Sequence, residues 1–429
     1  MRDELEAEKT RGNYRVHPAD FTRTRVLTLP TVALSILRGH KVSQQNALNK
    51  VFRELDQLEV VPTPSAYCQA RQKLKPELFA RLNQMVVEDF YRLYEADGAV
   101  KRWHGRRLLG ADGTTLNLPE SESLRAAFTV HCNQHEEFVQ ATAVVLHDLL
   151  NDLGLQASLG PVSGEKRPLL EDLWAATEES DILVLDRNFG DYSIIAWAVL
   201  TCRDVIIRCR RQSFSVVEEF WESNKIEALV TLNVSQSAET KRFVREHHLP
   251  ERVRVRLLKF RLPTGETEVL LTTLCDLKQY RRAEFYTVYG WRWSDETYYD
   301  RIKNIFEVER FSGHREEVIR QDFLGVIFLS TLESVLTKSA QQVLRERDQV
   351  RQTETQAQVN RAVSYVSLVD EAVSLLLDER VHPEDVLERL HQLFQKNPTR
   401  HRAGRKYDRV KLKHSRKLRY HRYRKRLLA

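Results

Sequence analysis

Over the first hundred positions, apolar residues recur at the three- and four-residue spacing of amphipathic helices. Leu34, Ile36 and Leu37 form one apolar group, and a second group runs from Ala47 to Leu55. The segment V-V-P-T-P-S then interrupts the pattern, because prolines cannot continue a helix. We predict a helical N-terminal DNA-binding domain over residues 1–100, in which residues 1–25 are polar and poorly ordered.

A short helix is predicted directly after this interruption. Thr63 or Ser65 can cap its start, and it ends before Pro76, where another helix begins. It carries Arg71 and Lys73, which we count as candidate DNA contacts. Two interpretations stay open: a DNA-reading helix of the helix-turn-helix type, or an ordinary short basic helix.

After residue 101 the pattern changes to the alternation and short apolar runs of β-strands. Helices are predicted at 168–177 and 191–200, and five strands at R-R-L-L-G-A-D-G-T-T-L-N-L, residues 138–147, L-G-L-Q-A-S-L, D-I-L-V-L-D and residues 204–208. The order of three strands, helix, strand, helix, strand is typical of a mixed α/β sheet flanked by helices. We assign residues 101–211 to the first part of this core.

The rest of the chain divides into four further segments. Residues 212–285 combine an acidic helix with three strand patterns and are predicted as a β-rich insertion. The core resumes over 286–336 with a helix from Tyr289 to Lys303 and a helical piece at 323–336. Helical pieces at 340–350 and 363–394 form a C-terminal region over 337–399, and residues 400–429 form a tail.

The composition is that of a soluble globular protein, with 42% hydrophobic and 30% charged residues. No run of about 18 apolar residues is present, and the N-terminus has no apolar leader, so we expect neither a membrane partner nor export. The five cysteines are widely spread without a C-x-x-C pair. We expect free thiols in a reducing compartment.

Positive charge is concentrated in the tail. Residues 400–429 hold fourteen Lys and Arg against one acid, Asp408, whereas the whole chain has a net charge of +7. Three tyrosines lie among these cations. Such a segment is expected to bind phosphate backbones with strong salt dependence, although a solubilising tail has the same composition.

The segment from Tyr289 to Lys303 gathers unlike polar groups on one helix face. At about 100° per residue, Tyr289, Arg292, Glu296 and Lys303 fall within about 60° of one another. Asp295 falls about 100° away from Glu296, so Glu296 is the better candidate for a functional carboxylate. A surface helix with ion pairs at i,i+4 is the alternative.

Two more carboxylates stand at strand ends, where functional groups of α/β sheets gather. Asp112 lies on the first strand and Asp186 ends the fourth. Together with Glu296 they offer hard oxygen ligands that suit Mg²⁺ or Mn²⁺. Two such ions about 4 Å apart can activate a water and stabilise the leaving oxygen in phosphodiester cleavage. Arg292 and Lys303 would then bind phosphates, and Tyr289 would pack beside them.

A phosphatase of the haloacid-dehalogenase type was the main competing interpretation of A-D-G-T-T-L. That loop needs a nucleophilic Asp two residues before Asp112, and Gly110 occupies the position. The phosphatase interpretation is therefore rejected.

With these residues in view, the chain resembles the DDE transposases of bacterial insertion sequences, in the IS-four family. The signature Y-x2-R-x3-E-x6-K is met by Tyr289, Arg292, Glu296 and Lys303, D-G-T begins at Asp112, and the D-R-N-F motif contains Asp186 and Arg187. The long β insertion is also similar to that of the family, as are two flanking segments, S-A-Y-C-Q-A-R-Q-K-L and V-E-R-F-S-G. Asp295 departs from the family, which commonly has an apolar residue there.

The resemblance implies a ribonuclease-H-like core in which Asp112, Asp186 and Glu296 are the catalytic metal ligands for two Mg²⁺ ions, with Mn²⁺ as a substitute. It implies that Tyr289, Arg292, Lys303 and Arg187 bind phosphate. It also implies binding to the terminal inverted repeats in double-stranded DNA, hydrolytic nicking, and joining of 3′-hydroxyl ends to target DNA. A synaptic homodimer in the bacterial cytoplasm, associated with the nucleoid, is expected. Two alternatives stay open: a DNA-binding protein descended from a transposase, and a nuclease without strand transfer.

Overall fold

The structure is a computed structural model that describes residues 1–23, 26–38, 43–132, 137–162, 168–234, 237–262, 264–353 and 355–401. The chain divides into two compact units. The helical unit comprises Met1–Leu93, Leu116–Ala141 and the described residues from Asp300 on, and the sheet unit comprises Tyr94–Thr115 and Thr142–Tyr299. The finer six-part division stays a prediction.

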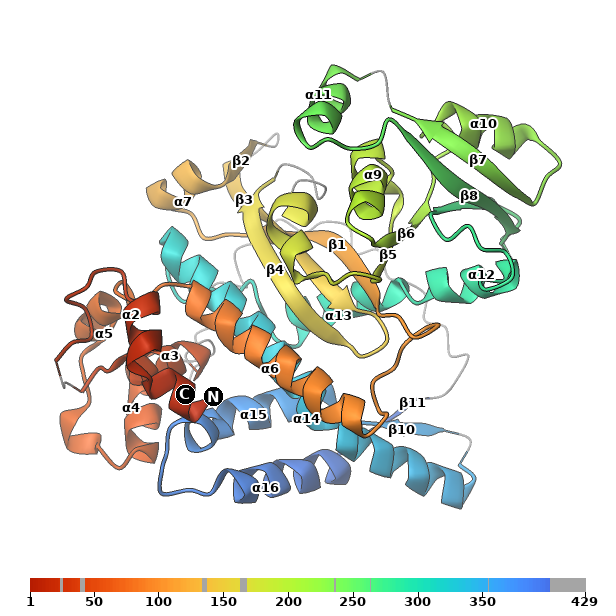
Figure 1. The fold of residues 1–429 in the computed structure, drawn as a ribbon. Helices are drawn as coiled ribbons and strands as arrows, with labels where there is room; N and C mark the ends of the chain where they lie inside the picture. Colours follow the sequence, from red (N-terminus) through yellow and green to blue (C-terminus); the bar gives the residue numbers. More distant parts are fainter. Residues whose placement is uncertain are drawn as a thin grey trace. The chain divides into compact units, whose positions relative to one another are not determined.

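A mixed sheet of nine strands confirms the predicted α/β class, while the ribonuclease-H-like topology stays a prediction. Its order is β2-β3-β1-β5-β6-β9-β8-β7, with β4 paired to β3 (Figure 1). Strands β1, β5 and β6 are parallel to one another, and β9, β8 and β7 follow in antiparallel pairs. The bounds are Thr129–Cys132 (β2), Glu137–Asp148 (β3), Leu108–Asn117 (β1), Leu153–Pro161 (β4), Ile182–Leu185 (β5), Asp204–Arg208 (β6), Glu227–Asn233 (β7), Arg252–Arg261 (β8) and Thr267–Thr272 (β9).

The residues predicted as an insertion extend the core sheet. Strand β9 pairs with β6, with Ile206 opposite Thr272, and so covers what would otherwise be an open sheet edge. The coverage fits the sequence of β6, where Val205, Ile206 and Ile207 are all fully buried. A strand buried on both faces needs a hydrogen-bonded neighbour on each side.

The helices of the sheet unit follow the predicted order with one change of type, and one helix, Ala238–Glu246, is added within the segment predicted as a β-rich insertion with one acidic helix. The segment predicted as a helix at 168–177 is a π-helical turn followed by a 3₁₀ turn, rather than an α-helix. The helical segments are Leu169–Leu173 (η3), Trp174–Ala176 (η4), Arg187–Phe189 (η5), Tyr192–Leu200 (α9), Ser215–Glu222 (α10), Ala238–Glu246 (α11) and Arg282–Gly290 (α12), with Trp293–Asn304 (α13) crossing the boundary between the units.

The helical unit corrects three predictions. Residues 2–14, predicted as poorly ordered, form two short helices. Residues 316–351 form one helix where two were predicted. The helical region predicted at 363–394 is interrupted before Pro383, which starts a new helix because the proline ring fits the first helical turn. The helices are Arg2–Glu6 (α1), Glu8–Tyr14 (α2), Leu29–Arg38 (α3), Gln44–Glu54 (α4), Leu58–Val60 (η2), Pro64–Arg71 (α5), Glu77–Ala96 (α6), Glu122–Ala127 (α7), Glu316–Arg351 (α14), Arg361–Leu376 (α15) and Pro383–Lys396 (α16), with a small hairpin of Gln356–Gln358 (β10) and Thr399–His401 (β11).

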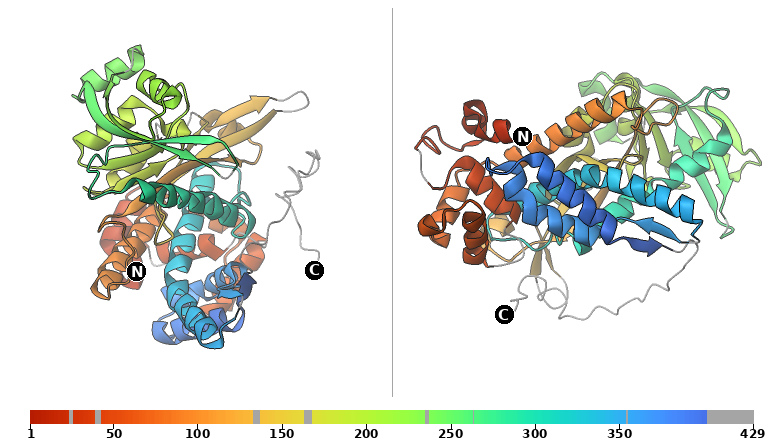
Figure 2. Two further views of the ribbon diagram at one scale, coloured as in Figure 1. Left: turned by 90° about the vertical axis from the view of Figure 1, so that its right-hand side faces the viewer. Right: turned by 90° about the horizontal axis from the view of Figure 1, so that it is seen from below.

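Helix α14 forms the centre of this unit, beside α15 and α16 (Figures 1 and 2). Gly325 permits close packing, since a Cβ there would lie 3.2 Å from Leu37 of α3. By length and composition alone, α14 is apolar enough to cross a membrane, but 72% of its apolar window is buried within the protein. A buried core helix shows the same property, so this helix is weak evidence for a membrane span.

Candidate active site

Two adjacent parallel strands place two of the three candidate acids side by side. Strand β1 pairs with β5 so that Ala111 lies opposite Leu185, and β6 continues the same register. The next residues along the three strands are Asp112, Asp186 and Arg208, on strands about 4.8 Å apart. The two acids expected to act together are therefore neighbours, with a cation beside them.

Backbone N–H groups orient both carboxylates. Asp112 Oδ1 accepts a hydrogen bond from the Gly113 N–H at 2.9 Å. Asp186 caps η5, where its Oδ1 accepts from the Asn188 N–H at 2.7 Å. Because side chains alternate along a strand, both acids lie on the face covered by α12, whose Phe285 joins the same buried cluster as the core of β5.

The predicted single helix from Tyr289 to Lys303 is two helices, which corrects that prediction. Helix α12 ends at Gly290 and α13 begins at Trp293. Between them the Arg292 N–H donates to the Tyr289 carbonyl at 3.1 Å, a bond over three residues that winds the chain more tightly than an α-helix. Gly290 favours such an interruption because glycine is a poor helix former.

Arg292 connects two of the candidate acids despite this break. Its Nη1 lies 3.6 Å from Asp112 Oδ2, and its Nη2 lies 3.2 Å from Glu296 Oε1. The residue is 7% exposed, and its guanidinium also lies over the rings of Tyr289 and Trp293. Burial lowers the Arg292 pKa, but Tyr289 and the two carboxylates outweigh this effect and raise it, so the cation is permanent.

Tyr289 is buried against this site at 4% exposure. Its hydroxyl has no hydrogen-bond partner among the described residues. Burial is the main cause that raises the Tyr289 pKa to about 12, with Arg292 acting in the opposite direction. At neutral pH it is therefore a phenol with an unused donor.

Glu296 is the most accessible of the three acids, with 42% of its side chain exposed. Within the described ranges, no three His, Cys, Asp or Glu side chains are grouped closely enough to hold a metal ion. Arg292 binds both Asp112 and Glu296, so their negative charges are balanced by a guanidinium in this arrangement. The donor chemistry suits a hard divalent cation, and Glu296 is exposed enough to change rotamer.

Two predicted phosphate ligands remain accessible. Arg187 follows Asp186 directly and is exposed. Lys303 is half-buried near the end of α13, in the part of that helix that belongs to the helical unit.

Arg71 does not have the role expected of it. It is 3% exposed and binds Asp322 at 2.5 Å and Gln321 at 2.6 Å, both on α14. Of the two predicted caps, Thr63 is the one that caps α5, by accepting the Ala66 N–H. The face of α5 that carries Arg71 is thus its buried face, and the arginine is a core residue rather than a DNA contact.

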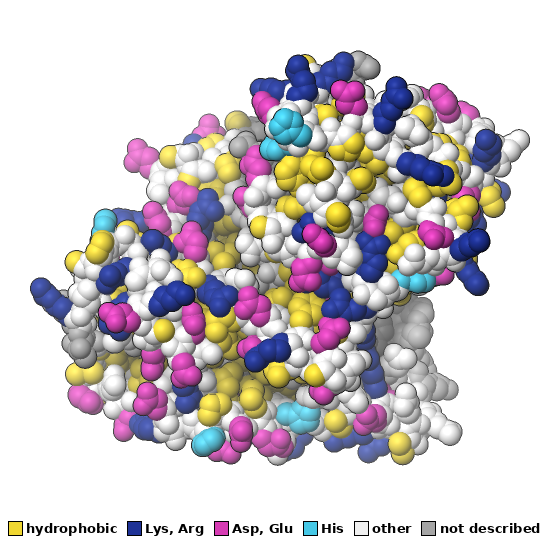
Figure 3. Space-filling view, viewed as in Figure 1, with side chains coloured by type: hydrophobic (Ala, Val, Ile, Leu, Met, Phe, Trp, Pro, Cys, Tyr) yellow, Lys and Arg dark blue, Asp and Glu magenta, His cyan; other side chains and the backbone are white. Residues whose placement is uncertain are grey.

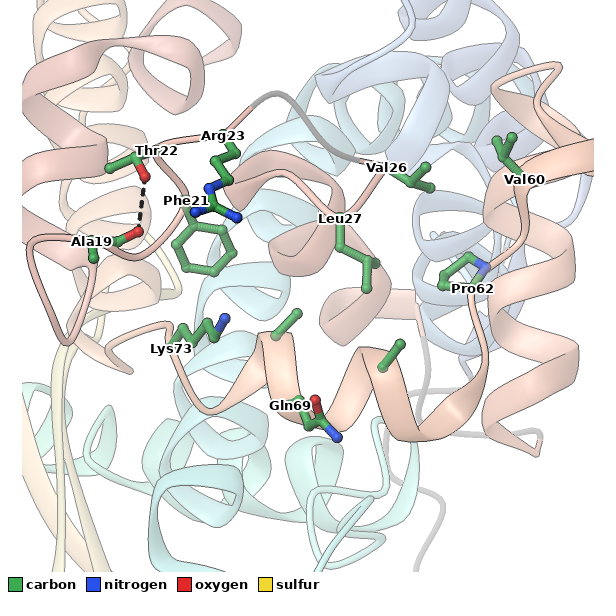
Figure 4. Close-up of a pocket in the computed structure, with 12 residues that line it drawn as sticks. Ala19, Phe21, Thr22, Arg23, Val26, Leu27, Val60, Pro62, Gln69 and Lys73 are labelled. Carbon is green, nitrogen blue, oxygen red and sulfur yellow. Dashed lines mark hydrogen bonds between the residues drawn. The ribbon is translucent and has the colours of Figure 1, made fainter.

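Lys73 lies on the accessible side, at the edge of a hollow of about 590 Å³ (Figure 4). Phe21 and Arg23 border this hollow above the exposed face of α5. Lys73 has a weak contact with Asp20 at 3.9 Å and is 49% exposed. It stays a predicted DNA contact.

Several residues at the site were missed in the sequence. Arg208 lies beside Asp186 and binds Glu268 at 3.1 Å, and Arg210 donates to Asn188 at 2.5 Å. The strand-end rule that selected Asp186 would have found R-C-R-R after β6. Trp293 is 54% exposed next to Arg292, which suits stacking on nucleic-acid bases.

The basic tail from residue 402 lies outside the described residues. On the face shown in Figure 3, Lys and Arg are intermixed with Asp and Glu. This mixture agrees with the sequence, where the tail holds the excess positive charge.

Comparison with known proteins finds structural likeness only at a distance. No family model matches the chain, and no curated protein matches it. A solved structure of a piggyBac transposase synaptic complex with hairpin DNA is similar at a TM-score of 0.40 and 8% identity, covering 86% of this chain and 77% of that one. A likeness this distant establishes no shared function, so function rests on the residues of the chain itself.

Proposed function

We propose that this protein is a DDE transposase of the IS-four type, which cleaves DNA at the ends of an insertion sequence and joins the 3′-hydroxyl ends to target DNA. The observation that carries this proposal is the position of Asp112 and Asp186, which each follow the paired residues Ala111 and Leu185 of two parallel strands, together with Arg292, which links Asp112 to Glu296. The Y-x2-R-x3-E-x6-K spacing supports the same conclusion.

Asp112, Asp186 and Glu296 would hold the metal ions, Mg²⁺ or Mn²⁺. When bound, these ions lower the pKa of a water and stabilise the leaving oxygen. Glu296 would exchange its contact with Arg292 for the metal, because carboxylates satisfied by a divalent cation no longer need the guanidinium. Arg292 would then be free to bind a DNA phosphate.

The remaining residues bind and orient DNA in this proposal. Arg187, Arg208 and Arg210 surround Asp186 with positive charge, which suits the phosphates next to the scissile bond. Trp293 stacks on a base, and Lys73 contacts phosphate from the helical unit. The partners are double-stranded DNA, at the transposon ends and at the target, and a second copy of the chain in the synaptic complex.

A joining assay tests this function directly. The full-length protein is incubated with Mg²⁺, a labelled duplex made from the inverted repeats that flank its gene, and a supercoiled plasmid. A transposase nicks the duplex at the repeat end and transfers the label to the plasmid. Nicking without transfer indicates a nuclease, and binding without nicking indicates a DNA-binding protein, so either result contradicts the proposal.

A further inference from the structure

A chain of three titratable residues begins next to Glu296, and two of them, Asp295 and His147, are buried. Asp295, the preceding residue, is 1% exposed, and its Oδ1 lies 2.9 Å from Nδ1 of His147 on β3. The Nε2 of the same imidazole lies 3.2 Å from Oδ1 of Asp152. Helix α13 is thereby joined to the sheet through the residue next to the candidate metal ligand.

The two contacts of His147 define its charge. A neutral imidazole has one N–H, so it cannot donate to carboxylates from both ring nitrogens, whereas an imidazolium can. Burial lowers the His147 pKa, but the hydrogen bonds to Asp152 and Asp295 outweigh this and raise it to about 9. Burial also raises the pKa of Asp295, against the effect of His147. The geometry favours the ionised pair, because both nitrogens face oxygens.

Gly110 of β1 provides the space that Asp295 occupies. A Cβ at position 110 would lie 2.1 Å from Asp295 Oδ2, closer than any real side chain tolerates. Gly110 is two residues before Asp112 and on the same face of the strand. The first turn of α13 therefore rests on the strand that carries one candidate ligand.

Two tyrosines of α13 complete this attachment. The ring of Tyr298 stacks on His147 with centroids 4.6 Å apart. The Tyr299 hydroxyl donates to the Asp112 carbonyl at 2.5 Å and accepts the Val145 N–H at 2.9 Å. Helix α13 thus has directional bonds to both β1 and β3.

A buried ion pair is an expensive means of holding a helix against a sheet. Apolar residues of similar volume would pack there at no electrostatic cost, and replacing buried pairs with them is often neutral or stabilising. A pair with fixed hydrogen bonds differs in that it permits one rotation and one axial position of the helix. The residue whose position it determines most directly is Glu296.

We propose that the Asp295–His147 pair is a positioning element, which sets the rotation of α13 so that Glu296 can bind metal together with Asp112 and Asp186. This inference rests on the proposed function. Asp295 and His147 act through Glu296 and do not themselves contact substrate.

The test measures Mn²⁺ binding by electron paramagnetic resonance, DNA cleavage and Tm on the full chain. Asp295→Asn is expected to weaken Mn²⁺ binding about 10- to 100-fold, which is the usual effect of losing a residue that orients a metal ligand without binding the metal itself. The double variant Asp295→Leu/His147→Leu is expected to recover the Tm through apolar packing while Mn²⁺ binding stays weak. A purely structural pair would recover both together.

Asp181→Asn is the matched control. Asp181 forms a buried ion pair with Arg107 at 2.8 Å. The two residues directly precede the amino ends of β5 and β1, far from the candidate metal ligands along these strands. Asp181→Asn should lower the Tm and leave Mn²⁺ binding unchanged. If Asp295→Asn or the folded double variant bound Mn²⁺ as tightly as the wild type, this inference would be overturned and the proposed function would stand. Absence of Mn²⁺ binding by the wild-type protein would overturn the proposed function, and this inference with it.

Discussion

Asp112, in the middle of β1, and Asp186, directly after β5, lie next to each other, each one residue beyond the paired Ala111 and Leu185. Two carboxylates in this position repel each other unless a cation lies near them. In this structure Arg292 supplies positive charge to Asp112 at 3.6 Å. From a position four residues before Glu296, the same arginine also contacts Glu296 at 3.2 Å.

Substitution of Gly110 tests how closely α13 rests on β1. Gly110→Ala introduces a Cβ that overlaps Asp295 Oδ2, so the helix must shift. We expect an unfolding free energy lower by about 1–3 kcal/mol, as for other overpacked cores, and reduced cleavage. Gly160→Ala in β4 is the control, because a Cβ there meets nothing within 4 Å. Equal stability of the two variants in urea would contradict the packing described.

The pH dependence of stability tests the charge of His147. Its pKa is raised in the folded state to about 9 from 6.5, so its contribution is fully present below about pH 6.5 and is lost as the pH rises through about 9. Asp295 and Asp152 face the imidazole from opposite sides, and Tyr298 stacks on it. We expect urea midpoints to fall between pH 6.5 and 9 in the wild type. His147→Gln should flatten this part of the curve, and an unchanged curve would show that His147 is neutral.

Arg71 and Lys73 should respond to substitution in opposite ways. Arg71→Ala leaves Asp322 buried without its cation and should cost about 3–5 kcal/mol of stability, measured by denaturant unfolding. Lys73→Ala should leave stability unchanged and weaken DNA binding. If Arg71→Ala folded normally and lost only DNA affinity, the corrected assignment of Arg71 would be wrong.

These two residues show how far the sequence could be interpreted. The pattern located the helix and offered Thr63 as one of two caps, but it extended the helix past Arg71, where α5 ends. Two basic residues two positions apart gave no indication of which one was buried. The partner of Arg71 is Asp322, some 250 residues away in the chain. Contacts at such separation have no local pattern, so a buried arginine and a DNA-binding arginine look alike in the sequence.

The arrangement of the candidate site was largely predictable because strand ends and helix spacing are local features, while the catalytic role of its residues stays a prediction. Asp112, Asp186 and Glu296 were selected from those features, and the structure places the first two on adjacent strands and joins Glu296 to Asp112 through Arg292. The break between α12 and α13 at Trp291–Arg292 was missed, because a turn closed by a bond over three residues spaces side chains almost as an α-helical turn does. Asp295 stood out in the sequence only as the poorer carboxylate candidate and as a departure from the family, since its partner His147 lies on a strand far away in the chain.

Deletion of residues 400–429 tests the role of the tail. Removing fourteen cations should weaken DNA binding and reduce the slope of log affinity against log salt concentration, because fewer counterions are released. Fluorescence anisotropy with a labelled duplex at several salt concentrations measures both quantities. An unchanged slope would show that the tail does not contact phosphate.

The most direct test of the central claim is a comparison of DNA binding with Mg²⁺-dependent cleavage in Asp112→Asn, Asp186→Asn and Glu296→Gln. Each change removes one charge and keeps the shape of the side chain. All three variants should bind the terminal repeats as the wild type does and should lose cleavage. Cleavage at the wild-type rate in any one of them would contradict the assignment of these carboxylates as the catalytic metal ligands.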